Sequence, residues 1–276
     1  MILDMTDEEY FAVSALDQTS LKLFEKSPAK MMAVLDNPVY KESYTLGSLA
    51  HAYALGTSKD GYQLKMNGRT KEGKEANDRA ISSHKTLVSR EELTLAEDMG
   101  TIANRYFQKI PGKPEQAIFE TLNGVKCKGK FDWLPDAPDD DGVLRIRDYK
   151  TIGADATEFP YHAWKYGYHV QAAFYMLLLR ANGYKGFLGF EFVVQEKTAP
   201  YDFLVYRLDE GSPEIELANK RINKALDDYR AMCDDVDCYQ RDVLMRLSGY
   251  SHAPRNLEFT DWQLGQEDER VNPVGM

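Results

Sequence analysis

The sequence predicts an α/β protein in which a mainly helical first third precedes a mixed sheet flanked by helices. Through residues 14–110 apolar side chains recur at helical spacing. After Pro111 and Pro114 they alternate with the period of a strand, and Asn123-Gly124, a strong hairpin signal, separates two such runs. The rest of the pattern gives the order β-β-β-α-β-β-α, which predicts an α/β sandwich around a mixed sheet.

Caps, prolines and glycines set the expected boundaries of the helical part. A basic connection with three glycines separates the third helix from a longer fourth one. The boundaries that these residues predict are Thr19 or Ser20 to Ser27, a short helix from Pro28, Thr45 to Gly56, and about 75–110 with an interruption near 88–91.

The second part is expected to contain five strands and two helices. The strands lie at 116–122, 125–134, 143–151, 187–195 and 201–208, and the helices at 160–182 and about 212–232. A chain of 276 residues can bury a substantial core, and we expect a single domain. Its parts are the helical region 1–110, the sheet region 111–235 and a polar tail at 250–276.

Composition indicates a soluble protein of a reducing compartment. Hydrophobic residues make up 43% of the chain and charged residues 28%, as in ordinary globular proteins. No apolar run reaches the roughly 18 to 20 residues of a membrane helix, and the acidic N-terminus shows no secretory signal. Cys127, Cys233 and Cys238 form no CxxC pair, which argues against a disulfide framework, a structural zinc site and a four-cysteine iron–sulfur site. We therefore expect a cytoplasmic location.

The charge of the chain argues against nucleic-acid binding but is unevenly distributed. The net charge is −10, whereas phosphate binders are often basic. Residues 59–90, however, carry eight Lys or Arg against four Asp or Glu, and residues 227–242 carry six acidic against two basic residues. A positive region could contact phosphates, although a solvated surface of mixed charge explains the same counts.

The stretch "GRTKEGKE", residues 68–75, has the spacing of a nucleotide-binding phosphate loop. In such a loop Ser or Thr follows the lysine and reaches a magnesium ion, but here Glu75 follows Lys74. No strong strand is evident just before it. We therefore expect a flexible basic loop and exclude an NTPase.

Two acids and a lysine gather around the third expected strand. Asp148 and Lys150 are two residues apart, so they share a strand face with Leu144 and Ile146. If this strand pairs with the preceding one, Asp132 can lie beside Asp148 on the same sheet face. Such carboxylates repel each other unless a cation holds them, and oxygen ligands favour Mg²⁺ or Mn²⁺ over zinc. Plain surface charges or a structural ion pair are the alternatives that the residues leave open.

Three motifs of the sequence resemble those of the PD-(D/E)XK nuclease superfamily, in particular its RecB-like and RecE-like exonuclease branches. They are Asp132, Asp148-Tyr149-Lys150 and the stretch "QAAFY" at 171–175. "SPAK", "LGSLAHAYALG" and "YHVQAAFY" resemble RecE-type (exodeoxyribonuclease VIII C-terminal) nucleases, over about residues 14–235. The resemblance implies a restriction-endonuclease-like core, with a mixed central sheet flanked by helices and an N-terminal helical region. It departs from the literal Pro-Asp of the family name, because Phe131 precedes Asp132.

The resemblance also implies a metal site. Asp132, Asp148, the main-chain carbonyl of Tyr149 and the imidazole of His51 would bind one or two Mg²⁺ ions, which Mn²⁺ can replace. His51 stands in a Gly-x-x-x-His pattern that begins at Gly47 and resembles the histidine motif of RecB-like members. By itself, a lone histidine on an apolar helix is more often a core residue.

Three further residues are implied to act in catalysis. Lys150 would act as a cation that holds water or phosphate, since two nearby carboxylates favour its protonated form. Gln171 and Tyr175, four apart on one helix face, would orient Lys150, the attacking water or a DNA phosphate. Tyr168 and Trp164 extend this stripe, and the alternative is an aromatic core, which is our expectation for Trp164.

The activity that the resemblance implies is Mg²⁺-dependent hydrolysis of DNA by an exonuclease. It would act on the ends of double-stranded DNA in the 5′ to 3′ direction and leave a 3′ single strand for homologous recombination. A single-strand annealing recombinase is an implied partner, and a homo-oligomer, often a ring-shaped tetramer, is the implied assembly. Basic residues expected to hold the DNA backbone are Arg69, Lys71 and Lys74, with Lys126, Lys128 and Lys130 as further candidates.

Two alternatives remain open. The first is a nuclease of the same fold with another polarity or substrate, such as a single-strand exonuclease or an endonuclease. The second is a DNA-binding or assembly module that has lost catalysis. The intact set of Asp132, Asp148 and Lys150 favours an enzyme.

Overall fold

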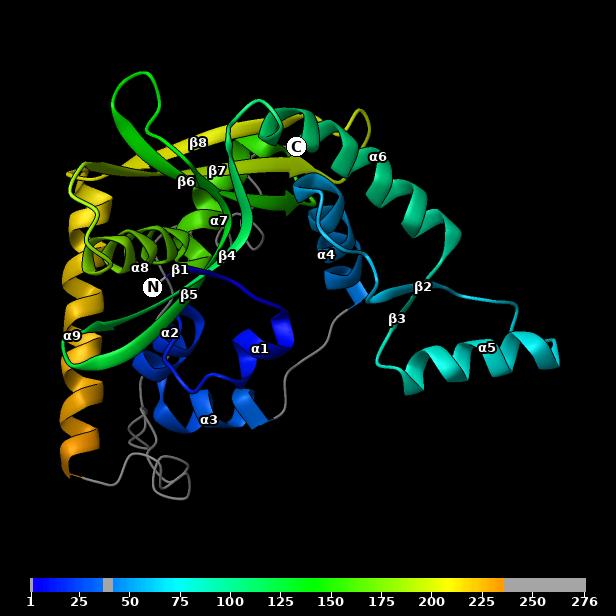
Figure 1. Cartoon of the computed structure of the whole chain (residues 1–276), viewed down its shortest axis with the longest axis horizontal. Coiled ribbons are helices and arrows are strands. Elements are labelled where there is room, and N and C mark those ends of the chain that lie inside the picture. The colour runs from blue at the N-terminus through cyan, green and yellow to red at the C-terminus, as the bar shows by residue number, and fades with distance from the viewer. Residues whose placement is uncertain (1, 37–41, 236–276) are drawn as a thin grey trace, which may run out of the picture.

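A six-stranded mixed sheet lies at the centre of the protein (Figure 1). The computed structural model describes residues 2–36 and 42–235, so the tail expected at 250–276 lies outside the described residues. In spatial order the strands are β1 (Ile2–Asp4), β4 (Gly112–Leu122), β5 (Val125–Pro135), β6 (Val143–Ile152), β7 (Phe187–Glu196) and β8 (Phe203–Asp209). Only β6 and β7 run parallel, and the other neighbours are antiparallel. The mixed sheet is confirmed, and β1 is an addition too short to show a pattern.

The predicted hairpin joins β4 to β5. Asn123 has φ 50° and Gly124 has φ 82°, so both central turn positions lie in the left-handed region that a type I′ turn requires. The turn fixes the register, in which Leu122 lies opposite Val125 and Gly112 opposite Pro135.

Helices cover both faces of the sheet and enclose two apolar cores (Figure 1). The larger core contains Phe131, Ile146 and Phe190 and lies under α2 (Gln18–Lys26), α8 (Tyr168–Ala181) and α9 (Pro213–Asp235). The smaller core joins Trp133 and Val193 to α4 (Glu42–Leu55) and α6 (Arg90–Phe107). The remaining helical elements are α1 (Asp7–Ala12), α3 (Pro28–Asp36), α5 (Lys71–Ser82), a 3-10 turn (Ala156–Glu158) and α7 (Phe159–Tyr166). Across 2–36 and 42–235, no helix has the length and apolarity needed to cross a membrane.

Several helix boundaries differ from the prediction. Asp17 caps α2, because its carboxylate accepts a hydrogen bond from the amide of Ser20 at 2.7 Å. Thr45 lies inside α4, which begins three residues earlier. The interruption expected near 88–91 is present but begins earlier, at 83–89, where β3 (Thr86–Val88) separates α5 from α6 and Ser89 caps α6. The single helix expected over 160–182 is broken at Gly167, whose φ of 67° ends α7 and starts α8.

Residues 57–89 form an arm that projects from the body of the protein (Figure 1). The arm contains β2 (Tyr62–Leu64), which pairs in parallel with β3, and the helix α5. The expected flexible loop at 68–75 is instead a capped helix start, since the Thr70 hydroxyl accepts from the amide of Gly73 at 3.1 Å. A Cβ at Gly73 would lie 2.0 Å from the carbonyl oxygen of Asn67, so this capping turn explains the second glycine of the pattern.

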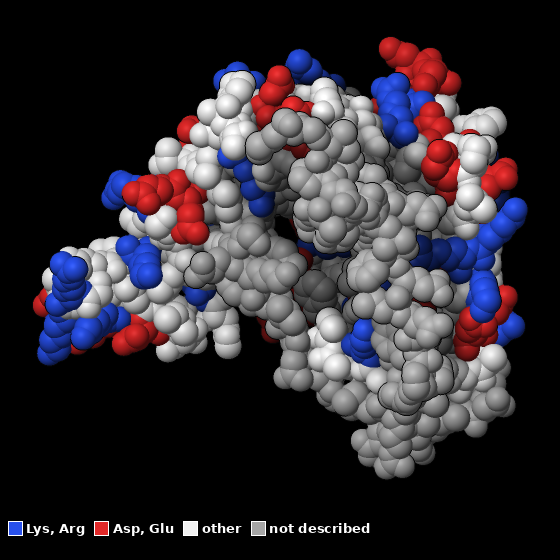
Figure 2. Space-filling model, turned by 180° about the vertical axis from the view of Figure 1, so that it is seen from behind, with Lys and Arg blue, Asp and Glu red and all other residues white. Residues whose placement is uncertain are grey.

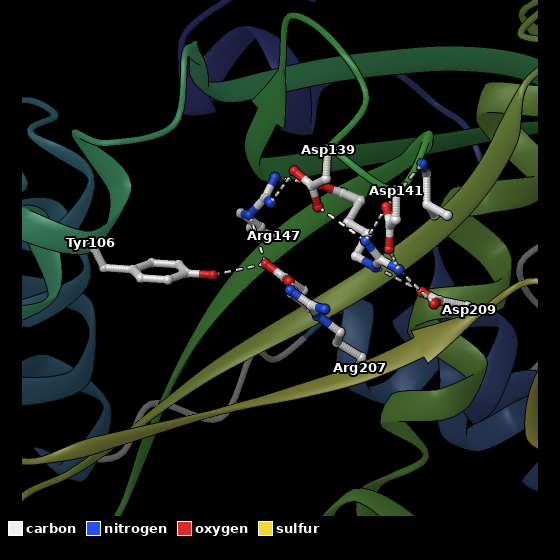
Figure 3. Close-up of polar contacts among 9 residues, drawn as sticks. Tyr106, Asp139, Asp141, Arg147, Arg207 and Asp209 are labelled. Atoms are coloured by element: carbon white, nitrogen blue, oxygen red, sulfur yellow. Dashed lines mark hydrogen bonds and ion pairs between the residues drawn. The ribbon is translucent and has the colours of Figure 1, made fainter.

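The face of β6 toward α6 carries a buried ion-pair network (Figure 3). The fully buried carboxylate of Glu191 accepts from the hydroxyl of Tyr106 at 2.8 Å and pairs with Arg147 and Arg207 at 2.7 Å each. Arg147 and Arg145 also bind the loop that joins β5 to β6, through Asp139 and Asp141, and Arg145 binds Asp209 of β8. The network therefore fixes that loop against the middle of the sheet.

Helices α4 and α6 approach each other closely at Gly100. A Cβ at Gly100 would lie 2.2 Å from the Cβ of Tyr53 and 2.8 Å from the carbonyl oxygen of Ala50. Because His51 lies between these two residues of α4, the contact at Gly100 also sets the position of the histidine.

We expect Gly100→Ala to destabilise the protein by about 1–3 kcal/mol through overpacking. An Ala normally stabilises a helix by up to about 1 kcal/mol relative to Gly, so the sign of the effect is diagnostic. The free energy of unfolding from urea titration measures it. The exposed neighbour gives the control, Thr101→Ala, which should stay within about 0.5 kcal/mol of wild type. A Gly100→Ala protein as stable as wild type would contradict the close approach.

Candidate active site

The site lies where β5 and β6 separate. Their ladder contains the pair Trp133–Arg147, and its continuation would place Phe131 opposite Tyr149. Instead, the Tyr149 amide donates to Oδ2 of Asp132 at 2.9 Å. Phe131 packs in the larger core and Trp133 in the smaller one, so the alternation of faces breaks at Asp132. Asp132 thus enters the site from the gap between the strands, which corrects the expectation that it shares the sheet face of Asp148.

His51 contacts Asp132 from α4. Its Nε2 lies 2.9 Å from Oδ2 of Asp132. Burial opposes a charge on the imidazole, but the neighbouring carboxylates outweigh it and raise the pKa of His51. Burial likewise opposes a charge on Asp132, but His51 and then Lys150 lower the pKa of this carboxyl. Both shifts favour the charged forms of this pair.

Asp148 lies under α8, and its two oxygens have different partners. Oδ1 accepts from the amide nitrogen Nε2 of Gln171 at 2.6 Å. Oδ2 forms no hydrogen bond but lies in an ion pair with the ammonium of Lys150. Burial, followed by the charge of Asp132, raises the pKa of Asp148 to about 6. The structure thus brings together four predicted site residues, His51, Asp132, Asp148 and Lys150, and Gln171 orients the third.

Lys150 remains positively charged in this environment. Its side chain is 22% exposed, and its ammonium lies 5.1 Å from the centre of the Tyr168 ring. Burial disfavours the charge, but Asp148 and Asp132 outweigh it and raise the pKa of Lys150. A lysine that keeps its proton is better suited to bind water or phosphate as a cation than to act as a general base.

Glu115 is a site residue that the sequence analysis did not identify. Its carboxylate lies 3.5 Å from Nδ1 of His51 and forms an ion pair with Lys130. Its φ of 55° is unusual for a residue other than glycine and turns it out of the regular β4 ladder. The hairpin register contained the signal, because counting back from Leu122 and Val125 places Glu115 opposite Asp132.

The carboxylates of the site are ligands of the type that a hard divalent cation prefers, but they are paired with protein cations. The carboxylates of Asp132 and Asp148 interact, and one oxygen of Asp148 is buried without a hydrogen bond. In the part of the chain that the structure describes, no group of three His, Cys, Asp or Glu converges in a way that could hold a metal ion. His51 lies against Oδ2 of Asp132, and Lys150 lies against Oδ2 of Asp148. An ion would therefore have to displace His51 from Asp132, or Lys150 from Asp148.

The main-chain geometry is compatible with the prediction that the carbonyl of Tyr149 binds a metal ion. The N–H and C=O of one residue in an antiparallel ladder point toward the same neighbour. Because the Tyr149 amide points at Asp132, we expect its carbonyl to face the same gap. The side chain points the other way and donates from its hydroxyl to Gln195.

The aromatic residues near the site differ from the prediction in which of them are buried and which are exposed. Tyr175 packs edge-on against Phe131 in the larger core, and burial raises its pKa, so the structure gives it a packing role and leaves its catalytic role a prediction. Trp164, expected in the core, is 76% exposed. The break at Gly167 is the reason, because it places α7 in a different phase from α8.

The basic residues that were predicted to bind DNA fall into two groups, one exposed and one bound within the protein. Arg69, Lys71 and Lys74 are exposed on the arm, where Figure 2 shows Lys and Arg side chains gathered at the tip. Lys128, in contrast, is buried and donates to the carbonyls of Tyr10 and Val13. Lys130 is paired with Asp7 and Glu115. Lys128 and Lys130 are therefore structural, because both ammonium groups are already bound within the protein, whereas Lys126 is exposed.

Comparison with known proteins agrees with this architecture. The family described as a PDDEXK-like domain of unknown function (DUF3799) matches residues 18–237. Among solved structures, a "Putative exonuclease" from Eubacterium rectale is similar at a TM-score of 0.58 and 15% identity, over 95% of this chain and 98% of that chain. The structure of SSO0001 matches at a TM-score of 0.32 and 13% identity, over 67% of this chain and 84% of that chain, which is too low to support an argument. No curated protein matches.

The order of elements and the family match lead to the same assignment. The mixed sheet flanked by helices, with its acids on adjoining strands and a lysine two residues after the second acid, has the restriction-endonuclease-like architecture that the sequence predicts. The chain belongs to the PDDEXK-like family DUF3799, and thereby to the PD-(D/E)XK nuclease superfamily.

Proposed function

We propose that this protein is a metal-dependent exonuclease that hydrolyses DNA from duplex ends in the 5′ to 3′ direction. The observation that carries the proposal is the convergence of Asp132, Asp148 and Lys150, with His51 and Gln171 in contact with the two acids. The family match supports a nuclease, and the exonuclease named among the similar structures supports action from an end.

The residues of the site would have different roles in hydrolysis. Asp132, Asp148, His51 and the Tyr149 carbonyl would hold Mg²⁺, or Mn²⁺ in its place. When bound, such an ion supplies a more acidic water and neutralises charge on the phosphoryl oxygens. Gln171 holds one oxygen of Asp148, which leaves the other oxygen directed into the site.

Lys150 has a separate task from the acids. Its ammonium would hold the phosphate or the attacking water by charge-assisted hydrogen bonds. Tyr175 would support the site from the core, where it packs against Phe131 beside Asp132.

The arm and the assembly would determine how DNA reaches the site. Arg69, Lys71 and Lys74 would hold the phosphate backbone without reading sequence. A ring-shaped homo-oligomer, such as a tetramer, would keep the enzyme on its duplex. The 3′ single strand that it leaves would pass to a single-strand annealing recombinase.

One experiment separates this proposal from its alternatives. Linear duplexes labelled at either the 5′ or the 3′ end, and a closed circle, are incubated with Mg²⁺ or with EDTA. Early release of the 5′ label from linear DNA alone, in Mg²⁺ alone, supports the proposal. Cleavage of the circle indicates an endonuclease, early release of the 3′ label indicates the other polarity, and binding without cleavage indicates an inactive module.

We expect Asp148→Ala and Lys150→Ala each to lower the cleavage rate by on the order of 10³-fold or more, because each removes a charge that the transition state requires. Time courses on the end-labelled duplex measure the loss. Asp228→Ala, which removes an exposed carboxylate on α9, is the matched control and should cleave at the wild-type rate. Wild-type turnover in either site variant would refute the assignment.

We expect the arm variant Arg69→Ala/Lys71→Ala/Lys74→Ala to bind duplexes of any sequence more weakly. The slope of log K against log salt concentration should become less steep by about 2–3, since each lost phosphate contact changes it by roughly 0.9. Titrations at several salt concentrations measure the slope. The control removes three exposed lysines elsewhere, Lys185, Lys220 and Lys224, and an equal change in both proteins would contradict a specific role of the arm.

Divalent cations should stabilise the folded protein through the same acids. We expect Mn²⁺ at a hundred times its dissociation constant to add about 2.7 kcal/mol, measured as a rise in Tm. The rise should disappear in Asp148→Asn and persist in Asp228→Asn. An equal rise in both variants would show that the ion binds elsewhere.

A further inference from the structure

Three aromatic side chains of α7 are exposed to solvent. Trp164 is 76% exposed, Tyr161 65% and Tyr166 51%, although all three belong to a helix of only eight residues. An aromatic side chain usually buries much of its surface in a core or an interface. Single exposed apolar residues are common, but three large aromatic side chains exposed on one short helix indicate a binding surface.

Ring contacts connect two of these side chains, Tyr161 and Tyr166, to the site. Tyr161 lies against His162, His162 against Tyr166, and Tyr166 against Tyr168, with ring centres 5.8–5.9 Å apart in each pair. The Tyr168 ring lies 5.1 Å from the ammonium of Lys150. Tyr161 and Tyr166 are thus the outer end of a row that reaches the site lysine, whereas Trp164, on the same helix, makes its ring contact with His169.

Trp164 has the orientation of a stacking surface. On one side its indole stacks on the imidazole of His169, with an angle of 10° between the planes and centres 5.6 Å apart. This contact fixes the plane of the indole while most of the side chain stays in solvent.

Positive charges surround the row. Lys22 of α2 donates from Nζ to the carbonyl oxygen of Tyr166 at 3.2 Å, and Lys165 lies within 6 Å of the rings of Tyr161 and Tyr166. Burial and then the charges of Lys150 and Arg221 lower the pKa of Lys22 to about 8, so these cations share one electrostatic environment. Exposed rings interspersed with cations suit a polyanion that carries flat apolar groups, which describes single-stranded nucleic acid.

We propose that Tyr161, Trp164 and Tyr166 form a platform on which unpaired bases of a DNA strand stack while a phosphate of that strand lies at Lys150. This inference rests on the proposed nuclease function and adds to it that the substrate has unpaired bases beside the site. The platform reads no sequence, because every base has a face that can stack. Strand ends that are frayed or single-stranded would bind better than closed duplex.

The test separates bases from phosphates. The full-length protein, with EDTA present to prevent cleavage, is titrated with a labelled dT12 oligonucleotide and with an abasic oligonucleotide of equal length and charge, and anisotropy is measured. We expect Trp164→Ala to weaken dT12 binding about tenfold, equivalent to about 1.4 kcal/mol, and to leave abasic binding unchanged. Trp164→Phe should recover most of the loss.

The control is an equally exposed aromatic residue far from the site. Phe187 is 68% exposed and pairs with Val143, seven residues along β6 from Lys150, so Phe187→Ala should change neither titration. Equal losses for both oligonucleotides in Trp164→Ala, or no loss, would overturn the platform. So would a change of oligomeric state with an unchanged ratio of the two affinities, which would make α7 an interface between copies of the chain.

Failure of the platform can be told from failure of the proposed function. If wild type and Trp164→Ala both cleave end-labelled duplex and bind dT12 equally, only the platform is wrong. If the wild-type protein cleaves no DNA in Mg²⁺, the nuclease proposal itself falls.

Discussion

The constraint on which the site depends is the burial of two carboxylates, Asp132 and Asp148, close enough to repel each other. Burial and mutual repulsion both disfavour ionisation, as the raised pKa of Asp148 shows. The fold supplies one cation to each acid, the imidazole of His51 to Asp132 and the ammonium of Lys150 to Asp148. The charges of the two acids are thus balanced within the protein, and under the proposed function a metal ion would take the place of one of these protein cations.

The acids can approach because β5 and β6 come apart, and the rest of the molecule limits that separation. On one side, the hairpin register and the packing of Phe131 under α8 hold β5. On the other side, Arg145 and Arg147 bind the loop between the two strands, which holds that loop beside the ladder pair Trp133–Arg147 (Figure 3). A buried network of this kind is weak evidence for net stability, since its charges lose hydration. Its clearer effect is to fix geometry, because the carboxylate of Glu191 binds donors on α6, β6 and β8.

Much of the fold could be predicted from the sequence, because its signals are local. Asn123-Gly124 fixes a turn whatever the rest of the chain does, and the alternation of Leu144 and Ile146 in β6 marks the face that packs in the larger core. Features that depend on contacts between distant segments could not be predicted in this way. The break at Gly167 reverses the exposure of Trp164 although the pattern reads as one continuous helix. Glu115 enters the site only because its φ is positive, and the face of Asp132 changes only because a ladder ends.

Among the predicted residues, those named from the resemblance, such as His51, gather as expected, whereas Lys128 and Lys130 were chosen by charge alone and are held by partners within the protein.

An acidic protein can act on a polyanion because electrostatic interactions in salt are local. At physiological ionic strength, exposed charges more than about 8 Å apart are largely screened, so the net charge of −10 has little influence on a phosphate already at the surface. What that phosphate meets is set by nearby side chains, the basic tip of the arm in one place and Lys22, Lys150 and Lys165 around α7 in another. The acids of the site are balanced by His51 and Lys150. Under the proposed function, an acidic body with local basic contacts would favour DNA only in the orientations that these contacts permit, and it would limit adhesion elsewhere on the surface.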